Sequence, residues 1–583
     1  MIERFDTCFH PFVLPFLAGM AFVLAACMVK GAVVVGQLDR DDRRKWALSL
    51  LRPELTVKNI VGIVLDCLLH VKLWKRNRLL GYMHSAIAFG WFMIIVLGHL
   101  QVLLYMPQRL STFYYPIFFD YFVEGGGHTL VSYALDFFLG VVLSGIALAV
   151  FKRFYSRLFG MRRTARPSFT NIMGLYSLWA IFPLRLLAEL CARSGDLSTV
   201  PWWGYSVALC CFMAVLPFSR YLHIPAEMLL VTFRNAGVSV TRPGKGMARL
   251  QADSCPNCGV CIDACPMNAD KANLRDSTVY LTRQLRRGNS RRISEISDKC
   301  LLCGKCTAVC QVGVDGPRLR ILSRAKRKYR ISPSFPSAAT ASASALASAQ
   351  ASGKVLYFGG CMSALTPQIG RSVESLLRKA GVEYEWLDRD GGLCCGRPLH
   401  TAGRIGQAAE LSDRLGAVIV GSGAHTLLVS CPICYREFRE RYSLGSIRLV
   451  HYADYFAELM DAGLLQLEKG DSCYVYHDPC ELGRGCGIYD SPRRLISKAA
   501  SIAEAPKNRA ESVCCGGSLG SLTLSFAQRE KITRSSLENL YESRADAIAT
   551  ACPLCLATFS RYSDRPVKDL AQILDEQTRQ IPL

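Results

Sequence analysis

Long apolar runs in the first 225 positions constrain the fold of this chain more than any other feature. Half of the 583 residues are hydrophobic although 20% are charged, so the apolar residues must be segregated into particular segments. Each run is long enough for a helix to cross about 30 Å of hydrocarbon. The sequence therefore predicts an all-α bundle of five transmembrane helices, near residues 11–36, 82–105, 129–151, 171–192 and 203–223.

A shorter apolar segment, Asn59 to Trp74, carries the polar residues Asp66, His70 and Lys72, and we interpret it as a helix in the membrane interface. If this segment crosses the membrane instead, the bundle has six spans. The first apolar run is longer than the hydrophobic part of a signal peptide and follows acidic as well as basic residues, so we expect no cleavable leader.

Many of the charges behind the formal net charge of +22 lie in loops between the apolar runs. Basic residues crowd positions 40–78 and 152–166, whereas the loops 106–128 and 194–202 carry almost none. Because loops rich in Lys and Arg stay on the cytoplasmic side, the N-terminus is expected outside and the chain after the fifth span in the cytoplasm. The charge needs no nucleic acid partner, and we expect a multi-pass protein of the cytoplasmic (inner) membrane.

Histidines in the membrane half indicate a haem, because a b-type haem takes axial ligands from facing helices at equal depth. His84 opens the second span and His223 closes the fifth, so they are the predicted pair for one haem b. His99 lies on a similar helical face about 22 Å deeper, where a second haem would need His128 or His10 as partner. The alternative is that His84 and His223 merely lie at the level of the lipid head groups.

Most of the 26 cysteines stand in tight groups after the membrane half, which favours metal binding in a reducing compartment over disulfides. Two runs of four cysteines have the spacing of bacterial ferredoxins, and four close thiolates repeated twice suit cubane clusters better than zinc. The fourth cysteine of each run ligates the other cube in two-cluster ferredoxins. The predicted ligand sets are Cys255, Cys258, Cys261 and Cys310 for one [4Fe-4S] cluster and Cys300, Cys303, Cys306 and Cys265 for the other.

The segment Ser332 to Ser352 is almost wholly Ser, Ala and Pro, which cannot bury a core and predicts a flexible tether. The chain after it repeats itself. Each half has a β-rich run before a first cysteine, then a Cys-Cys-Gly group and a final C-x-x-C, with helical segments between, so we expect two α/β halves. The repeated cysteines are Cys361, Cys394, Cys395, Cys431 and Cys434 in the first half and Cys480, Cys514, Cys515, Cys552 and Cys555 in the second.

This cysteine pattern resembles the cysteine-rich CCG domain of the heterodisulfide reductase catalytic subunit. The resemblance implies that five such cysteines hold a non-cubane [4Fe-4S] cluster. Because both sets are complete, it implies two non-cubane clusters rather than one.

The order of the parts is similar to that of membrane-bound heterodisulfide-reductase-type fusions, with a membrane module that resembles the nitrate reductase gamma subunit. It divides the chain into a haem-binding membrane module (1–230), an α-helical ferredoxin-type domain with two clusters (245–330), a linker (331–353) and two CCG domains (354–465 and 466–583). The chain also looks like the electron-transferring-flavoprotein:menaquinone oxidoreductase group. That likeness implies an oxidoreductase that passes electrons from a soluble flavoprotein through the clusters and haem b to menaquinone.

No G-x-G-x-x-G fingerprint follows a convincing strand, so a flavin or nicotinamide is expected on a separate partner. Three other functions stay open. The chain could be a disulfide or thiol oxidoreductase that draws electrons from quinol, a passive electron-transfer subunit of a larger complex, or the membrane arm of a lactate or glycolate dehydrogenase system. The direction of electron flow is open as well.

Overall fold

A computed structural model gives the architecture of the chain, and it describes residues 13–105, 130–159, 167–193, 200–241, 244–269, 275–325, 355–520 and 523–579. The chain forms two compact units. The first unit comprises Met1–Asp263 and Leu285–Gly288, and the second comprises Ala264–Gln284 and Asn289–Leu583.

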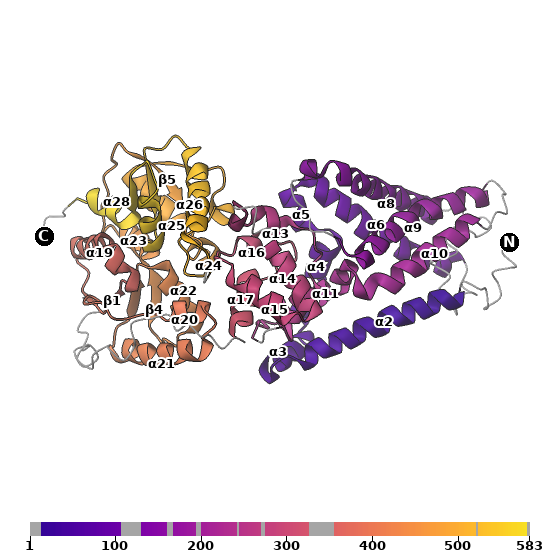
Figure 1. Cartoon of the computed structure of the whole chain (residues 1–583), viewed down its shortest axis with the longest axis horizontal. Helices are drawn as coiled ribbons and strands as arrows, with labels where there is room; N and C mark the ends of the chain where they lie inside the picture. Colours follow the sequence, from indigo (N-terminus) through magenta and orange to yellow (C-terminus); the bar gives the residue numbers. More distant parts are fainter. Residues whose placement is uncertain are drawn as a thin grey trace. The chain divides into compact units, whose positions relative to one another are not determined.

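Long apolar helices dominate the first unit (Figure 1). They are α2 (Val13–Gly36), α6 (Arg78–Tyr105), α8 (Leu130–Phe154), α9 (Phe169–Arg193) and α10 (Val200–Val215). Within the described ranges, four helices are long and apolar enough to cross a membrane, and a bent pair of helices would make a fifth span. The prediction of several apolar spans is therefore confirmed, whereas a count of five depends on the bent pair.

The bent pair departs from the straight fifth span that the sequence predicts. After α10 the chain passes through two 3-10 turns, η5 (Leu216–Phe218) and η6 (Arg220–Leu222), into α11 (His223–Asn235). The two parts meet at 73°. Pro217 explains the break, because proline has no N–H to continue the helix. His223 consequently begins a new helix instead of closing the fifth span.

The segment interpreted as one interfacial helix is also broken. It contains the end of α4 (Pro53–Ile63), a π-helical turn η1 (Val64–Leu68) and most of α5 (Val71–Arg76), while α3 (Arg40–Leu50) precedes it. His70 separates η1 from α5 with a left-handed backbone, φ 49°. A positive φ on a residue with a Cβ is uncommon, and π-turns occur frequently at functional sites.

Short helices carry the ferredoxin-type segments, as expected for an α-helical domain. They are α12 (Met247–Asp253), α13 (Val260–Ala264), η7 (Pro266–Ala269), α14 (Thr278–Arg287), α15 (Ser290–Asp298), α16 (Lys305–Ala308) and α17 (Gly316–Ala325). In the first unit α12 packs against α11 and α2. The start of the first cysteine run therefore folds against helices of the membrane half.

The C-terminal half has the predicted duplicated α/β architecture. Each half contains a four-stranded parallel sheet, in the order β2-β1-β3-β4 and β6-β5-β7-β8. The strands are β1 (Val355–Phe358), β2 (Tyr384–Trp386), β3 (Thr426–Val429), β4 (Arg448–His451), β5 (Cys473–His477), β6 (Ser501–Ala503), β7 (Ala547–Thr550) and β8 (Val567–Asp569). The main connecting helices are α19 (Pro367–Lys379), α20 (Arg397–Thr401), α21 (Ile405–Gly421), α22 (Pro432–Arg441), α23 (Tyr452–Asp461), α24 (Gly483–Cys486), α25 (Asp490–Ala499), α26 (Phe526–Tyr541), α27 (Pro553–Ser560) and α28 (Leu570–Glu576).

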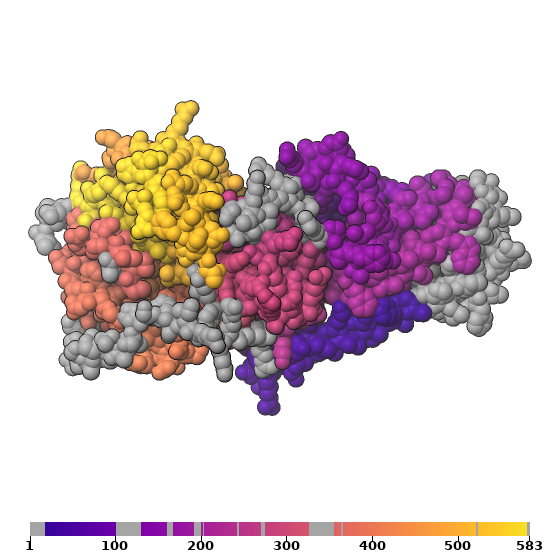
Figure 2. All heavy atoms as spheres, viewed as in Figure 1, coloured from indigo at the N-terminus to yellow at the C-terminus, as the bar shows by residue number. Residues whose placement is uncertain are grey.

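The central strands are apolar throughout because both faces of each sheet are covered. In β1, Val355 and Tyr357 point into a core that also contains residues of the second half, such as Tyr476 and Leu574. Leu356 and Phe358 point into a separate core of the first half. The two halves, orange and yellow in Figure 2, therefore pack as one body.

Candidate metal centres

The first and last cysteine motifs of each half stand at the carboxyl ends of neighbouring strands. Cys361 follows β1 and Cys431 follows β3, which pair in parallel. Cys480 and Cys552 follow β5 and β7 in the same way. Since the carboxyl ends of parallel strands meet at one edge, the topology brings these motifs together at the usual site for a ligand in such sheets.

In the first half the five thiols form a continuous chain of contacts. Cys361 reaches Cys394, Cys394 reaches Cys395, Cys395 reaches Cys434, and Cys434 reaches Cys431, each within hydrogen-bonding range. Hydrogen bonds from Cys361 and Cys395 lower the pKa of Cys394 to about 3. A thiolate is the form of cysteine that binds metal.

The second half repeats this chain of contacts. Cys480 reaches Cys514, Cys514 reaches Cys515, Cys515 reaches Cys555, and Cys555 reaches Cys552. The Sγ atoms of Cys515 and Cys555 are 3.4 Å apart. Each half thus brings its five predicted cysteines into one cluster of sulfur atoms.

Glycines shape both sulfur clusters in a way that suits an inorganic cluster. The glycines after the two Cys-Cys pairs, Gly396 and Gly516, have φ of +84° and +88°, which residues with a Cβ rarely adopt. A Cβ on Gly360 would lie 2.8 Å from Sγ of Cys434. The backbone approaches the sulfurs closely here, so the donor set and its surroundings fit an iron–sulfur group.

The two sulfur clusters differ in exposure. In the first half Cys361 is exposed. In the second half Cys514, Cys515, Cys552 and Cys555 are all buried, and Cys480 is partly buried. The first-half site therefore has a cysteine at the surface of the described protein.

The second ferredoxin-type run folds around a common point with the last cysteine of the first run. Cys265 has the sulfurs of Cys300, Cys303 and Cys306 as its charged neighbours, and burial first of all raises its pKa. The N–H of Leu302 donates to Sγ of Cys300 over 3.3 Å. These four cysteines are the set predicted for the second cubane.

The two runs share an unusual backbone. Asn257 and Leu302, each just before the second cysteine of its run, both have φ of +56°. The glycines that follow these cysteines, Gly259 and Gly304, have φ of +89° and +73°. A left-handed backbone is uncommon for leucine, so the surroundings of Leu302 must hold this turn, and Asn257 adopts the same conformation in the first run.

The first run lies in the first unit together with membrane helices. Arg286 donates to the backbone oxygens of Ala252 and Cys255. The charges of Lys152, at the end of α8, and Arg76 act on the thiol of Cys258. Cys310, predicted to complete this cluster, belongs to the second unit.

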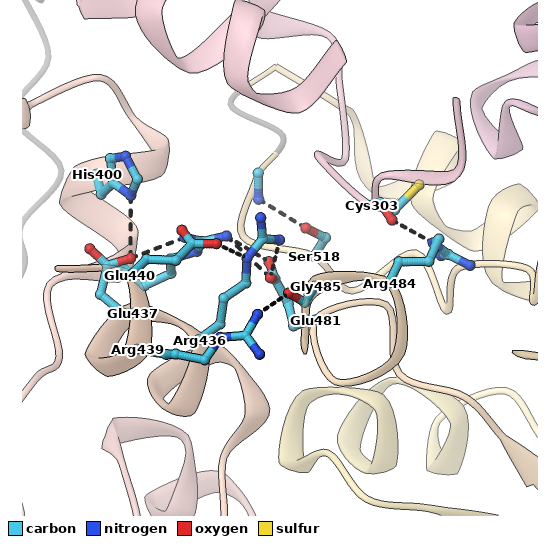
Figure 3. A network of polar contacts seen from close by, with 12 residues as sticks. Cys303, His400, Arg436, Glu437, Arg439, Glu440, Glu481, Arg484, Gly485 and Ser518 are labelled. Carbon is cyan, nitrogen blue, oxygen red and sulfur yellow. Dashed lines mark hydrogen bonds and ion pairs between the residues drawn. The ribbon is translucent and has the colours of Figure 1, made fainter. Parts of the chain in front are cut away.

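Cys303 of the second run lies directly beside Cys514 of the second half. Their side chains are within hydrogen-bonding range, and this contact lowers the pKa of Cys303 to about 6. Arg484 joins the same two regions, since its Nε donates to the oxygen of Cys303 over 2.7 Å and Nη1 to the oxygen of Ser512 over 2.9 Å. Figure 3 shows the bond to Cys303.

A buried ionic network joins the two halves next to the sulfur clusters (Figure 3). Arg397, directly after the first Cys-Cys-Gly group, bonds Glu437 over 3.1 Å and Glu481 over 3.1 Å. Arg436 also bonds Glu481, over 2.8 Å. Glu481 follows Cys480, so the network fixes ligand-bearing segments of both halves against each other.

In the first unit, His84 and His223 both fix one ring nitrogen on the backbone. Nδ1 of His84 pairs with the oxygen of Leu80 at 3.0 Å, and Nδ1 of His223 with that of Arg220 at 2.6 Å. This leaves Nε2 for a ligand, which is the usual arrangement of metal-binding histidine. His10 and His128, and the side chain of His99, lie outside the described residues.

Sequence reasoning missed His70, which was only noted as a polar residue of a short apolar segment. Its ring lies 5.5 Å from that of His84, centroid to centroid, and its Nδ1 pairs with the oxygen of Leu68 at 3.1 Å. The left-handed backbone of His70 produces this contact, and no residue pattern indicates such a conformation. Sequence reasoning also missed His477, which comes within 4.8 Å of Cys515 and Cys555.

Comparison with known families agrees with the cysteine motifs. Residues 355–439 and 474–560 match the family of the cysteine-rich domain CCG. Residues 251–314 match the 4Fe-4S dicluster domain family. The chain thus carries a dicluster segment followed by two CCG domains.

Three curated proteins illustrate the relationship. The chain is 23% identical over 389 residues to one of the subunits of dihydromethanophenazine:CoB–CoM heterodisulfide reductase from Methanosarcina barkeri, a match that covers 56% of this chain and 94% of that protein. It is 27% identical to EtfAB:quinone oxidoreductase of Syntrophomonas wolfei, over 34% of this chain and 30% of the relative. It is 25% identical to a protein of Chromohalobacter salexigens named "Probable membrane-anchored ferredoxin", over 35% of this chain and 32% of the relative.

Proposed function

Because the chain is an iron–sulfur oxidoreductase related to heterodisulfide reductase and to EtfAB:quinone oxidoreductase, we propose that it carries electrons from a soluble flavoprotein to menaquinone. Electrons enter at the first-half CCG cluster and pass to the second-half CCG cluster. They continue through the two cubanes to haem b and the quinone. Reverse flow would use the same groups.

The contact between Cys303 and Cys514 is the observation that carries this proposal. One cysteine belongs to the second cubane set and the other to the second-half CCG set. Two clusters held by adjacent thiolates are close enough to exchange an electron directly. The CCG domains are therefore arranged as part of a wire rather than as a separate reaction site.

The entry point follows from exposure. Cys361 is exposed, whereas Cys514 of the second half is buried and packs with Cys265 and Cys303 of the cubane set. A soluble donor can approach the first-half cluster without displacing any described part of the second. The flavoprotein is proposed as donor because the relative of Syntrophomonas wolfei is named for EtfAB.

Contacts within the first unit alone support the membrane end of the proposed electron-transfer path. The charge of Lys152 in α8 acts on the thiol of Cys258, which belongs to the first cubane set. Helix α12, which precedes this cysteine run, packs on α11, and α11 begins with His223. We assign His84 and His223 as the axial ligands of one haem b, which would supply one-electron transfer between cubane and quinone. The basic loops support a topology in which this end of the helices, and all iron–sulfur domains, face the cytoplasmic side of the inner membrane.

The test is reduction of a quinone analogue by the purified protein in detergent, with reduced electron-transferring flavoprotein as donor and haem absorbance followed over time. Fast haem reduction followed by quinol formation is expected. A parallel reaction with dithionite as donor controls for an intact wire. If dithionite reduces haem and quinone but the flavoprotein reduces neither, the assigned donor is wrong.

A second candidate is disulfide reduction, which the extensive match to the Methanosarcina barkeri heterodisulfide reductase favours. A cavity between the halves, lined among others by Cys480, Cys515, Cys555 and Arg397, could admit a small substrate next to the second cluster. Release of thiols from small disulfides, driven by reduced viologen, would support this function. It would displace the quinone assignment if quinone analogues stay oxidised in the same preparation.

A further inference from the structure

His477 and Phe358 occupy equivalent positions at the two sulfur clusters. Phe358 ends β1 three residues before Cys361, and His477 ends β5 three residues before Cys480. Each ring meets the aromatic side chain that stands four residues after the last cysteine of its half. Phe358 packs edge-on against Phe438 at 5.1 Å, and His477 packs edge-on against Phe559 at 4.7 Å.

The two positions differ in what they offer the sulfurs. A ring nitrogen of His477 and the sulfurs of Cys515 and Cys555 all lie within 4.8 Å of one another. The side chain of His477 therefore lies beside the thiol of Cys515. Phe358, fully buried at the corresponding place, can neither donate nor accept such a bond.

A purely structural role does not explain a histidine at position 477. It is 2% exposed, and its Nε2 is buried without a hydrogen-bond partner within the described chain. A buried polar nitrogen without a partner costs about 1–3 kcal/mol, a cost that the phenylalanine of the first half avoids. The nitrogen acquires a partner when a cluster occupies the five cysteines of the second half.

We propose that His477 donates a ring N–H to the sulfur of the second-half CCG cluster, at or beside Cys515, and thereby makes this cluster easier to reduce than the first-half cluster. Hydrogen bonds to cluster sulfurs stabilise the extra negative charge of the reduced state and raise the reduction potential. His477 is a positioning and tuning residue, because it acts through a ligand. The inference rests on the proposed function, in that both CCG sites hold clusters.

Unequal potentials would give the wire a direction. An electron that enters at the exposed first-half cluster would move downhill to the buried second-half cluster, which lies beside Cys303. The two CCG halves would thus be two different electron carriers that act in a fixed order, instead of two equivalent ones.

The experiment is an anaerobic redox titration of the full-length protein in detergent, with the CCG cluster signals followed by electron paramagnetic resonance. Cys395→Ser and Cys515→Ser each remove a ligand from one half and so assign the signals. His477→Phe is expected to lower the midpoint of the second-half signal by about 59 mV, a tenfold change for one electron, and to leave the first-half signal in place. Phe358→His is the reciprocal variant and should raise the first-half midpoint. His477→Gln, which retains a donor, should recover part of the loss.

The outcomes separate the inference from the proposed function. If wild-type protein shows no CCG cluster signals and its iron is accounted for by the cubanes, the proposed function fails. If both signals are present and His477→Phe leaves the second-half midpoint unchanged, only the role of His477 is refuted. If His477→Phe fails to assemble its cluster, Phe358→His decides, and an unchanged first-half midpoint in that variant overturns the inference.

Discussion

Arg484 of the second CCG half donates a hydrogen bond from Nε to the backbone oxygen of Cys303 in the second ferredoxin-type run, at a distance of 2.7 Å. The same guanidinium holds Ser512 through the backbone oxygen and the hydroxyl. It also faces the sulfurs of Cys480 and Cys514, whose charges raise the pKa of this arginine. One side chain thus joins the second ferredoxin-type run to the second CCG half, where the two proposed kinds of cluster would meet.

Arg484→Gln should slow electron passage between the CCG clusters and the cubanes at least tenfold while the clusters still assemble. Glutamine cannot hold Cys303 and Ser512 at the same time, and hydrogen bonds to a charged group are each worth about 1.5–3 kcal/mol. Stopped-flow reduction of haem by a flavoprotein donor, normalised to iron content, measures the effect. Arg439→Gln is the matched control, because Arg439 also bonds two backbone oxygens of this region, Gly485 and Cys486, but is exposed and does not bond the cubane run. Equal rates of haem reduction in Arg484→Gln and wild type would contradict the predicted role of Arg484 in electron passage between the CCG clusters and the cubanes.

Gly360→Ala should abolish the first-half CCG cluster and spare the second. Gly360 has φ of +86°, and its new Cβ would lie 2.8 Å from Sγ of Cys434. Gly381→Ala tests the backbone strain alone, since Gly381 has φ of +65° with open space around its Cβ. The control should lose about 1–2 kcal/mol of stability and keep both cluster signals. Retention of the first-half signal in Gly360→Ala would mean that the sulfurs do not close around this glycine.

The sequence predicted which cysteines belong together better than it predicted the backbone geometry of the chain. Cysteine spacing sorted the ligands into sets because each set lies on loops at fixed strand and helix ends, and the thiol contacts follow the same grouping, although ligation itself stays a prediction. The α/β halves were predictable from their β-rich runs. The left-handed turn at His70 was not, because it depends on how short helices pack. The bend at Pro217 was not either, because a proline does not always break a helix, and α9 continues through Pro183. The contact of Cys303 with Cys514 joins two motifs that are independent in sequence.

Arg397→Leu should destabilise the paired CCG halves by about 3 kcal/mol, the low end for a broken buried ion pair. Buried Glu437 loses its 3.1 Å bond to Arg397, while Glu481 keeps Arg436 as a partner. The side chains of Arg397 and Glu437 are only 3% and 1% exposed. Thermal unfolding in detergent, read from loss of cluster absorbance, measures the change. Arg494→Ala removes an exposed pair with Asp461 and should cost less than about 1 kcal/mol. A similar loss in both variants would refute the assigned role of burial.

Asp569 gives the C-terminal body a stability that falls as pH rises. Burial raises the pKa of Asp569 to about 7, while an unfolded aspartate titrates near about 3.9. Its contribution is therefore fully present below about pH 4 and is lost as pH rises towards 7, with a slope of at most about 1.4 kcal/mol per pH unit.

Asp569→Asn should remove this slope and raise stability at neutral pH. Asparagine can still accept the bonds that Tyr452 and the N–H of Ala571 donate to Oδ1. Unfolding temperatures between pH 4.5 and 7.5 measure the slope, and Asp461→Asn at an exposed carboxylate should leave it intact. An unchanged slope in Asp569→Asn would assign the pH dependence elsewhere.

The haem content of three single variants can show which histidines of the membrane half bind haem. His84→Ala and His223→Ala should each lose haem b, because each removes a proposed axial ligand whose Nδ1 is anchored on a carbonyl. Trp91 of α6 lies 5.7 Å from Phe212 of α10, so the helices that carry or lead to these histidines face each other. His70 lies next to Lys72 and Asp66, which form an ion pair with an N–O distance of 2.6 Å. His70 is therefore at the polar edge of the bundle.

His70→Ala should therefore retain the haem and serves as the matched control for the other two variants. The pyridine haemochrome assay on purified protein gives haem per chain, and cubane signals confirm that each variant is folded. About one haem in wild type and in His70→Ala, with little in the other two, supports the pair. Loss of haem in His70→Ala together with retention in His223→Ala would move the axial ligand to His70, and the strained turn that presents it would then be part of the haem site.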